Sequence, residues 1–325
     1  MSAGSTRPEL WILFAAVVGA AWAFTRPHAP PAAEPVRPAR RAPALAALPP
    51  GAQLAMRVDL RQVRQSTLGA ALTGGGREIS GLGRLSEICG FDPTEQIEEL
   101  AIALPEQRGE PALGIVATGD FDPERIIDCA AKVLSRRGGT PAPSRIGEFS
   151  SVRDRAGSGA EVAVRAGGPV IVGEGAYFRA MLDAADGRGA TLLGDEAHAT
   201  LREAVSGHGA IGVTFVTRPG WLARWVAEDE ALAAPLGAVR AGALRIDLEP
   251  SPRATLLLSC PAEVTCQALA KWAEQLIGKV RSGVEPDPIS EAKLAVEPNA
   301  VRVQLGFDPG AVQKLVLGLL LEKGQ

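Results

Sequence analysis

Two short clusters in this chain carry residue types that could bind an anion or a metal ion. Gly173-Glu174-Gly175 lies between a strand-like apolar run and a helix-like segment, which is where phosphate-binding loops occur. The G-x-G-x-x-G spacing fails at Phe178, and Glu174 puts a carboxylate where the anion would lie. Asp195-Glu196-Ala197-His198 lacks the i, i+4 histidine pair of a zinc helix, and its aspartate suits a helix N-cap. We therefore predict no cofactor and no metal ion here.

Catalysis by an activated nucleophile is not indicated either. The chain has three histidines, of which His28 lies in a proline-rich stretch and His208 precedes Gly209 in a loop, and no G-x-S-x-G sequence occurs. The carboxylates are scattered, so their spacing selects no acid–base pair. We predict no catalytic residue. The alternative is a hydrolase whose site residues converge only in the folded chain.

The four cysteines form an even set that two disulfides could use. Cys260 and Cys266 connect the end of an apolar strand to the first turns of a helix, a geometry that can bring Cα atoms within bonding range. Cys89 and Cys129 would then be the second pair. The competing interpretation is four buried thiols that act as small apolar side chains.

Trp221 and Trp225 are the best sequence candidates for a contact surface. They are four residues apart, and therefore on one face of a predicted helix, in a chain with only five tryptophans and one tyrosine. The simpler interpretation, which the sequence favours, packs both rings onto a sheet.

Residues 10–24, LWILFAAVVGAAWAF, form one uninterrupted apolar run that predicts contact with a membrane. The run is shorter than the roughly 20 residues of a typical spanning helix, and Ala21-Trp22-Ala23 has the form that signal peptidase cuts. Residues 25–50 are rich in proline, alanine and arginine, and would form an extended spacer of at most about 75 Å. Since a spacer is useful only to a tethered body, we favour an uncleaved signal-anchor over a secreted product.

Two observations disagree about the side of the membrane on which the body lies. The flank after the apolar run carries Arg26, Arg37, Arg40 and Arg41, and by the positive-inside rule this would keep the body in the cytoplasm. The even cysteine count favours an oxidising compartment. We place the body outside the cytoplasm, in the periplasm, on a single-pass anchor in the cytoplasmic membrane.

Charge and composition argue against a nucleic-acid partner. The formal net charge is −3; because residues 1–50 hold five arginines and two glutamates, the remainder carries about −6. A mildly acidic body offers no basic footprint for nucleic acid, and the few aromatic residues do not suggest a stacking platform.

Alternating and helical patterns predict an α+β body. Residues 52–60 alternate as a half-buried strand does, and residues 263–280 carry a helical apolar stripe. Three Phe-Asp-Pro triplets, beginning at residues 91, 121 and 307, each place Asp at an N-cap and Pro at N1. Further strands are expected within 98–105, 111–119, 161–167, 169–173, 209–217, 238–248, 254–260 and 299–307.

The same strand-then-helix pattern begins at Pro50-Gly51-Ala52 and at Pro298-Asn299-Ala300, and Gly209-Ala210 opens a third similar segment. From this we predict two diverged repeats, each an antiparallel sheet with helices packed on one face, preceded by one N-terminal hydrophobic helix. The expected organisation is a tail (1–9), an anchor or signal core (10–24), a spacer (25–50), a first α+β half (51–206) and a second (207–325).

Leu48-Pro49-Pro50-Gly51-Ala52 leading through a strand to Asp59-Leu60 resembles the opening of an uncharacterised class of bacterial envelope proteins. These have a short anchor, a Pro/Ala-rich spacer and a duplicated α+β body, and the resemblance implies no activity. The leading hypothesis is a membrane-tethered extracytoplasmic binding or scaffolding module that contacts the membrane through residues 10–24 and an envelope protein through its body. The sequence does not determine its oligomeric state.

Overall fold

The computed structural model describes residues 42–66, 85–105, 113–157, 159–218, 222, 235–283 and 286–312. The predicted anchor (10–24), Trp221 and Trp225 lie outside these residues, as does most of the spacer (25–50). Within them, no helix is long and apolar enough to cross a membrane.

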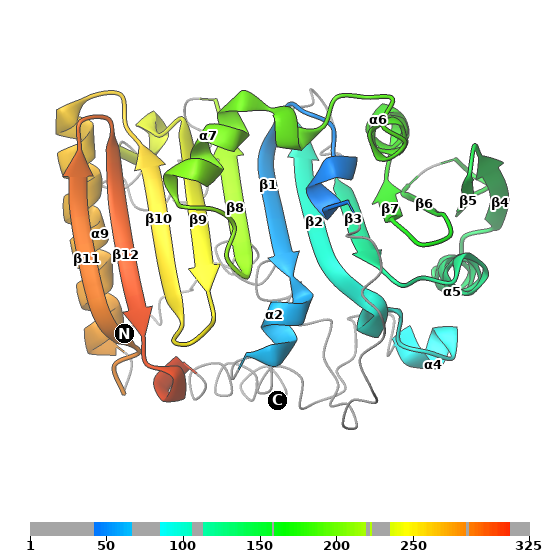
Figure 1. Ribbon diagram of the computed structural model, residues 1–325, viewed down its shortest axis with the longest axis horizontal. Helices are drawn as coiled ribbons and strands as arrows, with labels where there is room; N and C mark the ends of the chain where they lie inside the picture. The colour runs from blue at the N-terminus through cyan, green and yellow to red at the C-terminus, as the bar shows by residue number, and fades with distance from the viewer. Residues whose placement is uncertain are drawn as a thin grey trace, which may run out of the picture.

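Twelve antiparallel strands in the described chain form one continuous sheet, in the order β11-β12-β10-β9-β8-β1-β2-β3-β7-β6-β5-β4 (Figure 1). The first seven are β1 (Ala52–Asp59), β2 (Ile97–Pro105), β3 (Gly114–Gly119), β4 (Pro141–Ile146), β5 (Phe149–Asp154), β6 (Glu161–Val164) and β7 (Val170–Gly173). The other five are β8 (Ile211–Val216), β9 (Ala241–Asp247), β10 (Arg253–Ser259), β11 (Ile289–Glu297) and β12 (Ala300–Phe307). The structure thus has the α+β class and the large antiparallel sheet that the sequence predicts.

The two predicted halves meet at the pairing of β1 with β8, near the middle of the sheet. Leu54 lies opposite Phe215, and Val58 lies opposite Ile211. From this pair the strands run outward in similar orders, β1-β2-β3 followed by β7 on one side and β8-β9-β10 followed by β12 on the other. The two halves therefore share one sheet and do not form two separate ones.

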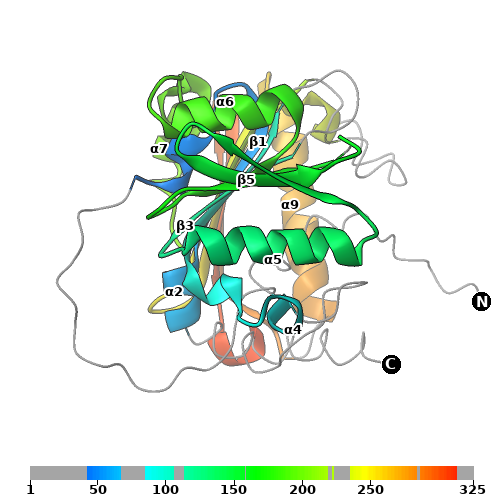
Figure 2. The same ribbon diagram turned by 90° about the vertical axis from the view of Figure 1, so that its right-hand side faces the viewer.

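Helices cover both faces of the sheet, so the predicted packing on one face is wrong. Figure 2 shows α7 (Glu196–Ala204) on one side and α9 (Glu263–Gly283) on the other. We call these sides the α7 face and the α9 face. The α7 face also carries η1 (Ala44–Ala47), α6 (Gly175–Ala185) and η3 (Leu192–Gly194), whereas the α9 face carries α2 (Leu60–Gln65) and α5 (Pro123–Arg136). Short elements α4 (Leu85–Cys89) and η2 (Pro93–Gln96) lie between α2 and β2 in the chain.

Small side chains explain why the α7 face is covered. Ala55, Ala101, Ala103 and Val116 from β1, β2 and β3 are buried on this face and pack in one cluster with η1 and α6. Methyl-sized side chains let a helix approach a sheet closely, so a strand that alternates Leu with Ala is buried on both faces. The same alternation in the sequence suggested a half-exposed strand.

The helix N-caps follow the predicted aspartates. Asp122 caps α5 by accepting from the backbone N–H of Glu124 at 3.0 Å, and Asp195 caps α7. Asp308 accepts from the N–H of Ala311 at 2.7 Å. Asp92 caps a 3-10 helix, η2, where the sequence suggested an α-helix.

Candidate functional site

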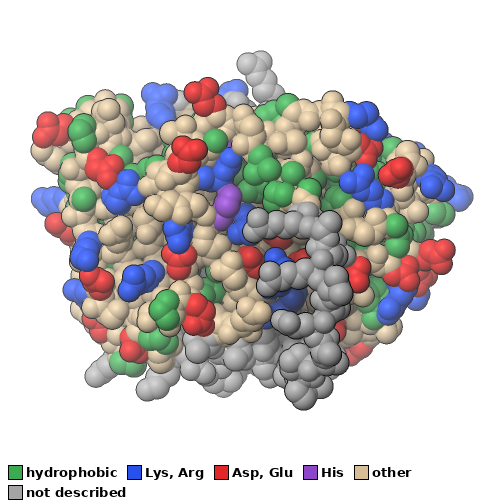
Figure 3. Space-filling model, viewed as in Figure 1, with side chains coloured by type: hydrophobic (Ala, Val, Ile, Leu, Met, Phe, Trp, Pro, Cys, Tyr) green, Lys and Arg blue, Asp and Glu red, His purple; other side chains and the backbone are tan. Residues whose placement is uncertain are grey.

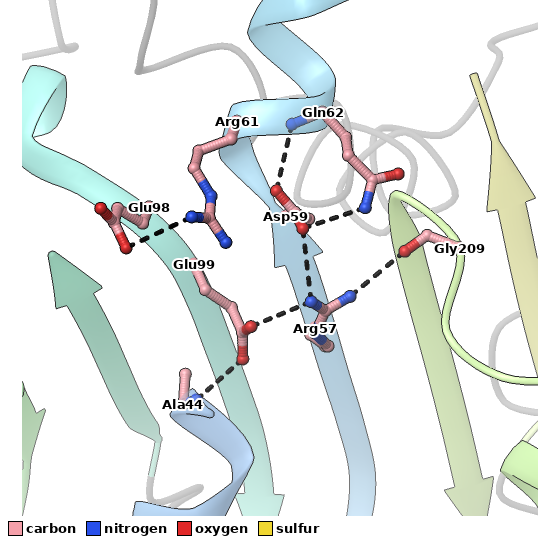
Figure 4. A network of polar contacts seen from close by, with 8 residues as sticks. All are labelled: Ala44, Arg57, Asp59, Arg61, Gln62, Glu98, Glu99 and Gly209. Atoms are coloured by element: carbon pink, nitrogen blue, oxygen red, sulfur yellow. Dashed lines mark hydrogen bonds and ion pairs between the residues drawn. The ribbon is translucent and has the colours of Figure 1, made fainter. Parts of the chain in front are cut away.

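A buried charge network lies near the middle of the sheet, where β1, β2 and β8 are neighbours (Figure 4). Arg57 of β1 donates from Nη2 to Glu99 Oε2 of β2 at 2.9 Å and lies 3.5 Å from Asp59 Oδ2. Its Nη1 donates to the carbonyl of Gly209, just before β8, at 3.2 Å. Asp59 and Glu99 are 6% and 8% exposed. One guanidinium therefore joins both halves of the sheet.

The remaining oxygens of these carboxylates also have partners. Glu99 Oε1 accepts from the N–H of Ala44 in η1 at 2.8 Å. Asp59 caps α2, accepting from the N–H and the Nε2 of Gln62, each at 3.0 Å. A carboxylate with such partners is held in one orientation. These hydrogen bonds connect η1, α2 and the segment before β8 to strands β1 and β2. Both carboxylates are therefore occupied by structural partners.

His198 is buried to 1% exposure beneath α7 and has a partner on each ring nitrogen. Nε2 lies 2.9 Å from the carbonyl oxygen of Ala52, and Nδ1 lies 2.7 Å from Thr214 Oγ1. Because a carbonyl only accepts, Nε2 carries a proton, and a neutral ring would accept from the threonine at Nδ1. Asp195 accepts from the N–H groups of His198 and Gly51. The Asp195–His198 cluster thus fixes α7 to β1 and β8.

His208 borders a small cavity of about 10 Å³ on the α7 face that Arg57, Arg202 and Thr214 also line. That volume holds about one water molecule and no substrate. Burial, with the charges of Arg57 and Arg202, lowers the pKa of His208 to about 4. His208 is therefore neutral at neutral pH. The Nη1 of Arg202 is buried with no partner among the described residues.

A larger polar pocket, of about 260 Å³, lies where α6 begins. Gly175, at φ +55°, starts this helix, and the N-cap Glu174 makes no side-chain cap hydrogen bond. The charged lining residues are Arg153, Asp154, Glu161 and Arg179. Glu161 accepts from Arg179 at 3.1 Å and from Ser151 at 3.0 Å. Two cations and two anions balance here, so the pocket beside Gly173-Glu174-Gly175 has no net charge that would favour a phosphate.

Both predicted cysteine pairs lie at disulfide distance. Cys89 and Cys129 join α4 to α5 with a Cα–Cα distance of 4.6 Å, and Cys260 and Cys266 join the end of β10 to α9 at 5.5 Å. The predicted contact pair Trp221 and Trp225 lies outside the described residues.

Comparison with known proteins gives a fold and no activity. No family model matches the chain, and no curated protein matches it. The solved structure of TP0453 in crystal form I is similar, with a TM-score of 0.50 and 12% identity over 86% of this chain and 98% of that one. Crystal form IV of TP0453 gives a TM-score of 0.51 and 11% identity over 84% and 96%. At such identities the similarity establishes the fold alone.

Proposed function

We propose that this chain is a membrane-anchored envelope protein whose folded body lies outside the cytoplasm and acts by binding or scaffolding. The observation that carries the proposal is the pairing of all four cysteines of the chain. Disulfides form and persist in oxidising compartments and are rare in the cytosol. The apolar run at 10–24 supplies the anchor in this proposal, and the part of the spacer that precedes η1 supplies the reach.

The saturated polar groups support a binding role over catalysis. Glu99, Asp59 and His198 each hold structural partners, and the cavity beside His208 is too small for a substrate. A general acid or base needs a lone pair or proton within reach of the reacting atom. In our proposal, the body therefore contributes surface and shape, and its ligand is another envelope component.

Protease accessibility in intact spheroplasts tests the location. Expressed in its native host, the body should be digested from outside, and digestion should stop at a fragment that remains with the membrane. Protection of the body until the spheroplasts are lysed would mean that the arginine flank set the topology, and the proposal would then fail.

The cysteine state gives a second, independent readout. Alkylation without reductant, followed by intact-mass measurement, should add no alkyl group to the exported protein and four after reduction. A variant whose apolar run carries two added arginines should stay in the cytoplasm and be alkylated without reductant. Labelling of the wild-type protein at four thiols would contradict an oxidising location.

We also infer that the body arose by duplication of one α+β unit. The similar strand orders on the two sides of β1–β8 support this, together with the position of α5 and α9 after the third strand of each half and on the same face. In this scheme β4 and β5 are a hairpin inserted into the first copy.

A further inference from the structure

The two edges of the sheet differ in whether they could accept another strand. At one edge, β4 and β5 form a hairpin with a two-residue loop, so Ile146 and Phe149 are its closing hydrogen-bonded pair. Alternation then turns the backbone groups of Pro141, Pro143 and Arg145 away from β5. Two of these three positions have no N–H, so this edge is blocked in the way that natural sheets block edges.

Within the described residues, the other edge, β11, has no proline at its outward-facing positions. It pairs with β12 through another two-residue loop, with Glu297 opposite Ala300. The same alternation turns the N–H and C=O groups of Ala292, Leu294 and Val296 outward. None is proline, and Val296 is 46% exposed, one of few large apolar side chains that are exposed in the described chain. Unpaired peptide groups of this kind accept an extended strand.

Charge identifies the strand that fits. On the α7 face of β11, Glu291 and Lys293 form an ion pair within the chain at 2.7 Å, and both side chains are more than half exposed, so this pair can re-form with a second copy. Figure 3 shows that charged side chains of both signs are interspersed over this face of the molecule. If two β11 strands pair antiparallel about a two-fold axis at Ala292, Glu291 of each lies opposite Lys293 of the other. Opposed pairs of opposite charge stabilise a strand pairing, whereas like charges destabilise it.

Other symmetric registers fit less well. If the two-fold axis passes through Lys293, the lysines of the two copies lie opposite each other. If it passes through Leu294, Glu291 of one copy lies opposite Glu297 of the other, and both registers place like charges together. Centring on Ala295 opposes Lys293 to Glu297, whose carboxylate is held at 2.7 Å by the less exposed Arg302, whereas the Glu291–Lys293 pair is the more exposed of the two. We propose that β11 is a homodimerisation edge, at which two copies of this chain pair antiparallel about Ala292 and join their sheets into one.

Helix α9 has room beside its copy in this arrangement. It packs over β12 as well as β11, so its axis lies inward of the edge by roughly half a strand spacing. Two copies would then place their α9 axes about 10 Å apart, within the usual range for packed helices. Arg281 lies 3.7 Å from Asp287, which precedes β11, so this face of α9 borders the edge. Gly278 lies three residues before it, and a Cβ there would meet no atom within 4 Å.

Sedimentation of the full chain in detergent micelles measures the dimer directly. The wild-type protein should be dimeric in the micromolar range. Glu291→Lys alone and Lys293→Glu alone should each be monomeric, because each opposes two like charges. An equimolar mixture of the two variants should recover a dimer, because every opposed pair then has opposite signs. An ion pair within one chain could not produce this recovery.

Two further variants separate the edge from general effects. Ala292→Pro removes an outward N–H and should abolish the dimer while circular dichroism and the melting temperature show a folded body. Lys132→Glu changes an exposed charge on α5, which the proposed interface does not include, and should stay dimeric. A monomeric wild-type protein, dimers of both single charge variants, or a mixture that stays monomeric would each overturn the proposal. It does not depend on which ligand the body binds.

Discussion

At the scale of single residues, neighbouring glutamates of β2 contribute very differently. Glu99 is buried, bonds Arg57 and holds η1 through Ala44. Glu98 is paired with Arg61 at 3.7 Å, where both side chains are substantially exposed. Desolvation makes an unpaired buried charge costly, whereas solvent screens an exposed pair. Two adjacent residues of β2 therefore have different roles: Glu99 stabilises the fold, and Glu98 is a surface charge.

Substitution of the two glutamates tests this difference. Glu99→Leu leaves Arg57 with the Gly209 carbonyl and the longer contact to Asp59, and it leaves the N–H of Ala44 without its acceptor, so we expect a loss of about 3 kcal/mol in the free energy of unfolding. Glu99→Gln keeps a carbonyl acceptor and should cost about half of that. The matched control Glu98→Gln should change stability by less than about 0.5 kcal/mol. Urea unfolding measures all three, and equal losses at positions 98 and 99 would contradict the assignment.

His208 makes the free energy of unfolding depend on pH. Its pKa is about 4 when folded, below the ordinary 6.5, so between these values the unfolded chain binds more protons. The contribution of neutral His208 to the free energy of unfolding is therefore fully present above pH 6.5 and is lost as the pH falls toward 4. We expect wild-type protein to lose about 1 kcal/mol more than His208→Gln between pH 7 and pH 5, after allowance for solvent screening. Parallel losses in the two proteins would show that His208 titrates normally.

At the scale of elements, the central strands were predictable and the edge strands were not. The sequences of β1, β2 and β8 to β10 show either alternating or continuous apolar residues, as buried strands do. Their predicted positions agree with the structure to within a few residues. β4 contains two prolines, and β11, ISEAKLAVE, has the composition of a helix. Pairing with β5 and β12 outweighs these local preferences, and such long-range pairing leaves no local pattern in the sequence.

The polar centre could be predicted only in part. Asp195 was recognisable as an N-cap and His208 as a loop residue. The bond between Arg57 and Glu99 joins residues 42 positions apart, so no spacing rule connects them. The available signal was two charged residues inside each of two largely apolar strands, because a buried charge requires a partner. These residues are Arg57 and Asp59 in β1 and Glu98 and Glu99 in β2.

The two disulfides should differ in their contribution to stability. Cys89 and Cys129 are 40 residues apart, whereas Cys260 and Cys266 are six apart. In the chain-entropy description, closing the longer loop stabilises by about 4 kcal/mol and the shorter by about 2. Replacing both members of each pair by alanine, followed by chemical denaturation, should show the larger loss for Cys89 and Cys129. The reverse order would show that local packing at α9 dominates.

At the scale of the whole molecule, the shared sheet couples the halves. β1 pairs with β8 over five residue positions, and Arg57 bonds the backbone beside β8. We expect one calorimetric unfolding transition, with calorimetric and van't Hoff enthalpies that agree. Separately expressed 42–206 and 207–325 should aggregate, since each would expose an apolar central strand as an edge. Two transitions, or two soluble folded halves, would contradict this coupling.

The position of η1 has a mechanical consequence. Ala44, Leu45, Ala47 and Leu48 are buried against the middle strands, within the last part of the predicted spacer (25–50). A force transmitted through that spacer would act near the middle of the sheet, so it would not pull mainly on one half. The force would therefore enter the sheet between its two edge strands, β4 and β11, and not at either edge.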